Sequence, residues 1–150
     1  MNITGMVHVN INCSDFDRSK AFYEMLGFRE FWRVPETNTP EVAAAVGMPP
    51  YRVKGALMQL QNASPPVTID LLEWIEPHSN ESPYKTLYQR GIARLALASS
   101  DLKADYNYLL AQGVEVVSAP AEVKINDQHG SRFFCFRDPD GTFLELVESY

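Results

Sequence analysis

The sequence predicts an α+β protein in which one β-α-β-β-β module occurs twice. Three observations carry this prediction. A strand pattern, a helix cap and a glycine follow one another near the start of the chain, and the same order returns 86 residues later, with Gly113 falling on Gly27 (113 − 27 = 86). A proline-containing turn then joins two extended segments near the C-terminus. Two such modules, about 4–76 and 90–149 with a polar connector at 77–89, predict one domain of curved mixed sheets around a shared cavity.

The first module opens with a strand and a helix. Residues 7–12 alternate apolar and polar side chains, which is the pattern of a half-buried strand. Ser14 or Asp15 can cap the amides of the helix that follows, and Gly27 suits its left-handed end. The second module repeats these features with a strand at 93–98, a cap at Ser100-Asp101 and a stop at Gly113.

Extended segments follow each helix. We expect them at 53–61 and 67–75 in the first module, and at 114–117, 132–136 and 142–147 in the second. The turn Asp138-Pro139-Asp140-Gly141 predicts that the last two pair antiparallel. Two regions lie outside this repeat: a short helix capped by Thr39, and a polar connector with some helix at 78–90.

Composition favours a small-molecule partner. A formal charge of -6 with a pI near 5.0 argues against nucleic acid and acidic lipid surfaces. No apolar run approaches the ~18 residues of a membrane span, and the start of the chain has no basic region before an apolar run, so a cytoplasmic location is expected. Cys13 and Cys135 lack CxxC spacing, which indicates two reduced, packed thiols.

Two groups of motifs, at opposite ends of the chain, resemble a known family. The opening group is His8-Val9-Asn10-Ile11, Asp15, Ser19, Phe22-Tyr23 and Leu26-Gly27-Phe28, and the closing group is Asp138 to Gly141 with Phe143-Leu144-Glu145-Leu146. They resemble the vicinal oxygen chelate superfamily, which holds glyoxalases, bleomycin-resistance proteins and extradiol dioxygenases. The resemblance implies a homodimer and a divalent metal (Zn, Ni, Mn, Co or Fe) held by one residue from each of four inward-facing strands.

The four ligand positions carry over residue by residue. The first is His8 and the last is Glu145. Asp70 and Glu73 compete for the second, and the two-residue period of a strand decides for Asp70, because it sends Asp70 inward and Glu73 outward. The third position holds Arg94, where the family usually has histidine. A guanidinium stays protonated and donates no lone pair, so the predicted metal ligands are His8, Asp70 and Glu145.

Three functions follow from this set. The first is a metal-dependent lyase or isomerase, glyoxalase-like or epimerase-like, in which Glu145 moves a proton next to a carbonyl. The second is a metal-free protein of the bleomycin-resistance type that sequesters a ligand. The third is a metal-free enzyme that uses Arg94 as the electrophile, with the guanidinium paired to Asp70 and Glu145. Dioxygenase chemistry is disfavoured, because Arg94 stands where the second histidine ligand of iron is needed.

Overall fold

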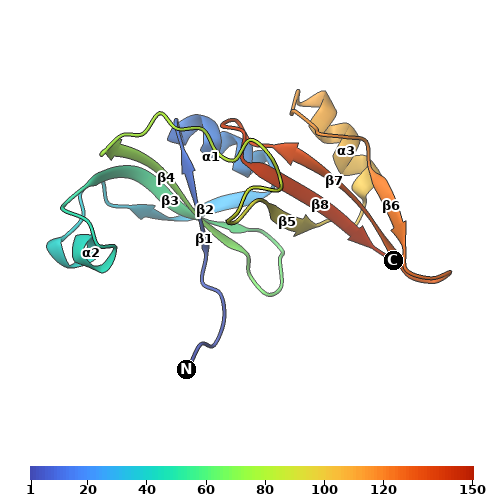
Figure 1. Ribbon diagram of the computed structural model, residues 1–150, viewed down its shortest axis with the longest axis horizontal. Helices are drawn as coiled ribbons and strands as arrows, with labels where there is room; N and C mark the ends of the chain where they lie inside the picture. The colour runs from blue at the N-terminus through green and yellow to red at the C-terminus, as the bar shows by residue number, and fades with distance from the viewer. The chain divides into compact units, whose positions relative to one another are not determined.

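A computed structural model describes all residues from 1 to 150. The chain forms two compact units, Met1–Glu81 and Ser82–Tyr150. Each unit contains one four-stranded mixed sheet and few helices (Figure 1). The predicted α+β class with two mixed sheets is confirmed, and neither sheet closes into a barrel.

The first unit has the strand order β1-β4-β3-β2. β1 runs parallel to β4, and the other neighbours are antiparallel. Its elements are β1 (Val9–Cys13), α1 (Phe16–Met25), β2 (Phe28–Val34), α2 (Pro40–Ala45), β3 (Arg52–Leu60) and β4 (Thr68–Glu76). Because β1 and β4 are parallel neighbours, the chain must cross over between them, and α1 together with β2 and β3 makes that connection.

Local sequence explains where α1 begins and which face it buries. The side chain of Asp15 accepts a hydrogen bond from the backbone N–H of Arg18, which satisfies one of the free amides of the first turn. Gly27 follows the helix with a φ of 98°, a conformation that favours glycine. The helix packs on one face of the sheet, and the fully buried side chains there are Phe16, Tyr23, Phe28, Met58, Ile69 and Leu71.

The second unit repeats this topology in the order β5-β8-β7-β6. Its elements are β5 (Leu95–Ala98), α3 (Leu102–Ala111), β6 (Ala121–Lys124), β7 (Gly130–Arg137) and β8 (Phe143–Ser149). The expected turn between the last two strands is confirmed. Asp138 Oδ1 accepts the backbone N–H groups of Asp140 at 3.0 Å and Thr142 at 2.8 Å, and Gly141 takes a φ of 97°.

Three details of the secondary structure were predicted incorrectly. The segment 114–117 is no strand: Val116 makes a single bridge with Phe136, because the following residues, with Pro120, interrupt the ladder until β6 begins. β2 was not placed, although the module requires a strand there. The connector 78–90 has no helix, only irregular chain and turns.

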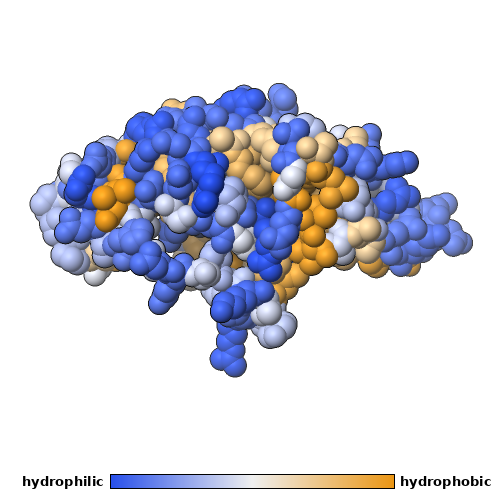
Figure 2. Space-filling view, turned by 90° about the horizontal axis from the view of Figure 1, so that it is seen from above, coloured by the Kyte–Doolittle hydropathy of each residue, from blue (hydrophilic) through white to orange (hydrophobic).

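No helix of the structure is long and apolar enough to cross a membrane. The surface seen in Figure 2 is largely hydrophilic, with hydrophobic side chains gathered in separate areas. Some large hydrophobic side chains of the first unit are exposed, among them Trp32 at 50% and Phe31 at 56%. Both lie on β2, which is an edge strand of its sheet.

Candidate functional site

The two faces of β4 have different surroundings. Ile69 and Leu71 are fully buried on the side covered by α1. Glu73 lies on that same side, because its Oε2 accepts the backbone N–H of Phe16 at 2.9 Å. Asp70 therefore points to the other face, which we call the inner face of the first sheet. The side-chain alternation inferred from the sequence correctly separated Asp70 from Glu73.

His8 and Asp70 form the polar pair of the first unit. Nε2 of His8 lies 4.0 Å from Oδ2 of Asp70, and the two side chains are 39% and 18% exposed. Asn10, which pairs with Asp70 across the parallel strands, donates from Nδ2 to the Asp70 backbone carbonyl at 3.0 Å. The other carboxylate oxygen, Oδ1 of Asp70, is buried without a hydrogen-bond partner. A buried acceptor in this state is costly unless a ligand, ion or water reaches it.

Burial also changes the proton affinity of Asp70. Desolvation raises the pKa of this carboxyl above its ordinary value of 3.8, and the opposing effects of His8 and Asn10 are smaller. The folded protein therefore holds the Asp70 proton more tightly than the unfolded chain does. The ionised carboxylate is a source of instability at neutral pH, and this instability disappears as the pH falls through the folded pKa toward 3.8.

We expect Asp70→Asn to raise the melting temperature at pH 7 to 8, because the amide carries no charge to desolvate. The gain should shrink as the pH is lowered toward 4 and vanish below it, as measured by thermal unfolding monitored by circular dichroism. Asp17→Asn is the matched control with the opposite sign, since the hydrogen bond from Lys54 lowers the pKa of Asp17. An Asp70→Asn variant less stable than the parent at pH 8 would contradict this assignment.

Arg94 and Glu145 form the polar pair of the second unit. Nε of Arg94 lies 2.7 Å from Oε2 of Glu145, whose side chain is 9% exposed, whereas that of Arg94 is 43% exposed. The thiol of Cys135 on the neighbouring strand donates to the same oxygen at 3.6 Å. Burial, then Glu145, raises the pKa of this thiol above 9.0, so it stays neutral. The guanidinium is thus anchored by Glu145, while much of the Arg94 side chain stays exposed.

The two pairs occupy corresponding places in the two sheets. Asp70 lies opposite Asn10 in the first unit, and Glu145 lies opposite Ala96 in the second. In each unit the partner side chain comes two residues earlier, from His8 or from Arg94. The internal repeat inferred from the sequence therefore extends to the candidate site, since each unit contributes one acidic residue and one basic partner.

Neither unit taken by itself offers enough ligands for a divalent metal. Within either unit, no three His, Cys, Asp or Glu side chains gather into a metal-binding group. The first unit offers His8 and Asp70, and the second offers Glu145 with its carboxylate already paired to a permanent cation. A metal at Glu145 would have to displace Arg94 or accept a positive neighbour.

Sequence reasoning missed two features of the candidate site. Trp32 on β2 pairs with Leu57 on β3, which pairs with Asp70 on β4, so Trp32 belongs to the inner face, but β2 was not predicted as a strand. Cys135 was interpreted only as a packed thiol, yet it contacts the carboxylate of Glu145. The predicted hairpin of β7 and β8 could have revealed this contact, because its register makes Cys135 and Glu145 direct cross-strand partners.

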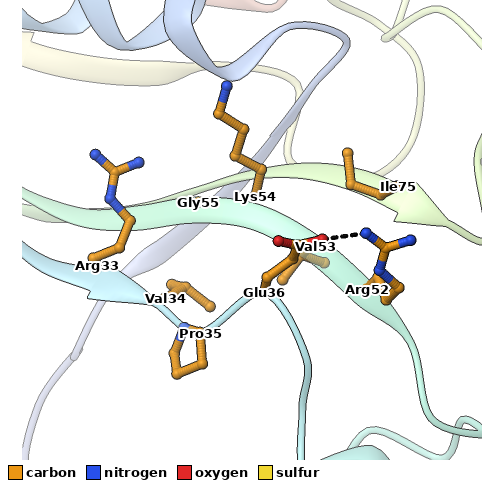
Figure 3. Close-up of a pocket in the computed structure, with 9 residues that line it drawn as sticks. All are labelled: Arg33, Val34, Pro35, Glu36, Arg52, Val53, Lys54, Gly55 and Ile75. Atoms are coloured by element: carbon orange, nitrogen blue, oxygen red, sulfur yellow. Dashed lines mark hydrogen bonds and ion pairs between the residues drawn. The ribbon is translucent and has the colours of Figure 1, made fainter.

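A pocket of ≈ 470 Å³ lies elsewhere in the first unit, at the ends of β2 and β3 (Figure 3). Three basic side chains line it, and each has its own acidic partner. Arg33 pairs with Glu30 at 2.6 Å, Lys54 pairs with Asp17 at 2.6 Å, and Arg52 pairs with Glu36. The pocket contains none of the four predicted site residues, and its basic charges are compensated locally.

Comparison with known proteins identifies the family. The model of the glyoxalase/bleomycin resistance protein/dioxygenase superfamily matches residues 5–146. The chain therefore belongs to this superfamily, as the motifs at its two ends predicted. It is 28% identical over 149 residues to the protein YwkD of Bacillus subtilis, with 99% of each chain covered.

Solved structures share the fold at lower sequence identity. A glyoxalase family protein from Bacillus cereus superposes with a TM-score of 0.83 at 18% identity, covering 99% of this chain and 96% of the other. The fosfomycin resistance protein FosX from Listeria monocytogenes has a TM-score of 0.61 at 16% identity, covering 98% and 94%. FosX has also been solved in complex with Mn(II) and sulfate. Proteins of this superfamily bind small-molecule ligands.

Proposed function

We propose that this chain binds a small oxygenated molecule without a metal, and that Arg94 supplies the positive charge that a divalent ion supplies in many relatives. The supporting observation is the ion pair of 2.7 Å between Nε of Arg94 and the nearly buried carboxylate of Glu145. This contact fixes the guanidinium through one edge. Its two terminal nitrogens stay available to a ligand, and such paired donors match the oxygens of a carboxylate or phosphate.

The same arrangement suits a metal-free lyase or isomerase as well as a sequestering protein. A guanidinium that donates two hydrogen bonds can stabilise negative charge on a carbonyl or enolate oxygen of the ligand. Glu145 acts here as a positioning residue, because its Oε2 is engaged by Arg94 and by the Cys135 thiol. Turnover would then require another group to move the proton.

A metal-dependent lyase or isomerase is the second candidate. One observation favours it: the buried Oδ1 of Asp70 has no partner, and His8 lies close to the other oxygen of the same carboxylate. An imidazole and a carboxylate are suitable ligands for zinc, manganese or nickel. This candidate requires Glu145 to exchange Arg94 for the metal, and the solved complex of FosX with Mn(II) is a precedent for a metal only within the fold.

Ligand binding with and without chelator separates the two candidates. The purified protein is treated with EDTA, dialysed, and refilled in separate samples with Zn, Ni, Mn, Co or Fe ions, and its metal content is measured by mass spectrometry. Each sample is then titrated with malonate, glycolate and inorganic phosphate while thermal unfolding is followed. We expect at least one probe to stabilise the metal-free protein, since any ligand of the folded state raises its unfolding temperature.

The refilled samples should show the same stabilisation as the metal-free one. Stoichiometric metal, together with stabilisation seen only after refilling, would overturn the metal-free proposal in favour of the second candidate.

We also propose that the chain acts as a cytoplasmic homodimer built from two modules per chain, by analogy with its relatives. Light scattering coupled to gel filtration measures the mass, and a value of one chain would refute the dimer.

A further inference from the structure

We infer that Arg137 fastens the segment of chain that leads to Arg94 and thereby positions the Arg94 guanidinium for its ligand. The inference rests on the proposed function, because Arg94 is the ligand-binding group there. It makes Arg137 a positioning residue, which acts on the ligand only through another part of the chain. Both residues belong to the second unit.

The guanidinium of Arg137 on β7 connects four segments of the second unit. Its Nε lies 3.1 Å from Oε1 of Glu115, its Nη1 donates to the backbone carbonyl of Gly141 at 2.9 Å, and its Nη2 donates to that of Lys85 at 3.5 Å. Its Cζ lies 3.9 Å from the centre of the Phe143 ring. Because all three nitrogens have acceptors and the side chain is only 23% exposed, Arg137 serves as a clasp within the protein and not as an anion site.

The contact with Lys85 ties down a segment that buries little apolar surface. We call residues 84–93 the entry segment, because they lead into Arg94 and then β5 (Figure 1). The entry segment contains no helix or strand, and its Tyr88 and Ile92 side chains are 87% and 73% exposed. Apolar burial therefore contributes little to its order, and polar contacts such as the one from Arg137 determine its conformation.

Gly91 transmits this restraint to Arg94. The φ of Gly91 is 119°, and a Cβ at this position would lie 2.1 Å from Oη and 2.9 Å from Cζ of Tyr84. The Tyr84 side chain thus packs against the Gly91 backbone and closes residues 84–91 into a loop. Tyr84 adjoins Lys85, and Gly91 lies three residues before Arg94, so a loop fixed at Lys85 also fixes the approach to Arg94.

A fixed entry segment lowers the cost of binding a ligand. The Arg94 side chain is 43% exposed and is held by its 2.7 Å contact with Glu145. That contact requires the Arg94 backbone to stay at a set distance from β8. When the entry segment is loose, the ligand has to order the guanidinium as well as bind it, and this ordering costs affinity.

Trypsin measures the fastening, because it attacks the carbonyl that follows a lysine or arginine side chain. The carbonyl of Lys85 is the one that accepts the hydrogen bond from Arg137. We expect Arg137→Lys to raise cleavage after Lys85 by roughly 3- to 10-fold relative to cleavage after Lys124, which lies on β6 of the same unit. General destabilisation would raise both rates together, and an unchanged ratio of the two rates would overturn the inference.

Ligand affinity tests the link to Arg94. In calorimetry with EDTA present, Arg137→Lys should bind malonate roughly 3- to 10-fold more weakly than the unsubstituted protein, because lysine keeps the charge but loses the planar fork. Arg132→Lys is the matched control and should leave this affinity unchanged. Arg132 also lies on β7, but it pairs with Glu122 of β6 at 3.2 Å and lies over the ring of Tyr150.

A double-variant cycle shows whether the effect runs through Arg94. Arg137→Lys should cause no further loss of malonate affinity in an Arg94→Ala background, where NMR titration measures the weak binding. A purely structural role for Arg137 predicts the same loss in both backgrounds. That result would overturn the inference.

Gly91→Ala loosens the entry segment while it leaves Arg137 intact. It should weaken malonate and speed cleavage after Lys85 as Arg137→Lys does, because the added Cβ displaces Tyr84. Gly113→Ala is its control, since Gly113 has a φ of 73° but nothing lies within 4 Å of an added Cβ. Far-ultraviolet circular dichroism checks that each variant is folded, and parental malonate affinity in a folded Gly91→Ala would contradict the inference.

The outcomes separate this inference from the proposed function. If Arg94→Ala weakens malonate while Arg137→Lys does not, the positioning role is wrong and the proposed function stands. If Arg94→Ala leaves malonate affinity unchanged, the proposed function is wrong and the inference fails with it, whatever the rate of cleavage after Lys85.

Discussion

Arg94→Ala is expected to weaken the tightest of the small anionic probes by roughly 10- to 100-fold, as measured by calorimetry in chelator. Hydrogen bonds to a charged group contribute about 1.5–3 kcal/mol, and about 1.4 kcal/mol corresponds to a factor of ten in affinity. The effect should be large because the guanidinium is anchored at 2.7 Å by a carboxylate that is itself 9% exposed. Because Glu145 already holds the guanidinium in place, ligand binding does not have to restrict the motion of this side chain.

Two further variants separate charge from geometry. Arg94→Lys keeps the positive charge but loses the fork of nitrogens, so it should recover only part of the lost affinity. Arg90→Ala removes an exposed arginine four residues away and should leave affinity unchanged. Binding that survives in Arg94→Ala at the affinity of the unsubstituted protein would refute the role assigned to this residue.

The loss of the Arg94 side chain also leaves the Glu145 carboxylate without its cation. Because Arg94 is nearly half exposed, the effect on stability is reduced by solvent screening and should stay near 1 kcal/mol. Glu145→Gln combined with Arg94→Ala should be more stable than Arg94→Ala alone, since the double variant contains no unpaired buried charge. Urea unfolding of the four proteins in this cycle measures the difference and shows that lost binding is not lost folding.

Phe134→Ala is expected to destabilise the folded chain by about 3–5 kcal/mol, the range for removing a buried phenylalanine. Phe134 is 1% exposed, and its ring meets that of Tyr106 edge to face with centroids 5.1 Å apart. Tyr106 lies on α3, so Phe134 is part of the contact that holds this helix on its sheet. Its other ring neighbour is Phe136, at 5.9 Å.

Tyr108→Ala is the control on the same helix. Tyr108 is 47% exposed, so its removal should change the free energy of unfolding by less than about 1 kcal/mol. Both variants can be followed by urea unfolding with far-ultraviolet circular dichroism. A loss below about 1 kcal/mol in Phe134→Ala would show that the packing described for the second unit is wrong.

Sequence reasoning succeeded where one local rule dominates. Asp15 caps α1, Gly27 ends its turn at positive φ, and the Asp138 turn joins β7 to β8, because each depends on a few adjacent residues. The alternation of β4 also separated Asp70 from Glu73. These features need no knowledge of distant contacts, so the sequence alone predicts them.

Reasoning from pattern failed where pairing between distant strands decides. Residues 114–117 alternate like a strand but bridge β7 only at Val116, and β2 is a strand because β3 lies beside it. The unpartnered oxygen of Asp70 could not be predicted either, because it depends on how β4 packs between β1 and β3, which are distant in the sequence. The pairing of Arg94 with Glu145 was foreseen as a possibility, whereas the shared contact with Cys135 was not.

The thiol at position 135 has one more consequence for the chemistry of its surroundings. A sulfur that resists deprotonation is a slow nucleophile toward peroxide and electrophiles, so oxidative stress leaves it largely as it is. The carboxylate beside it therefore keeps a neutral neighbour from mildly acid to mildly alkaline conditions. Under the proposed function, this thiol therefore adds to the anion site no charge that changes with pH over this range.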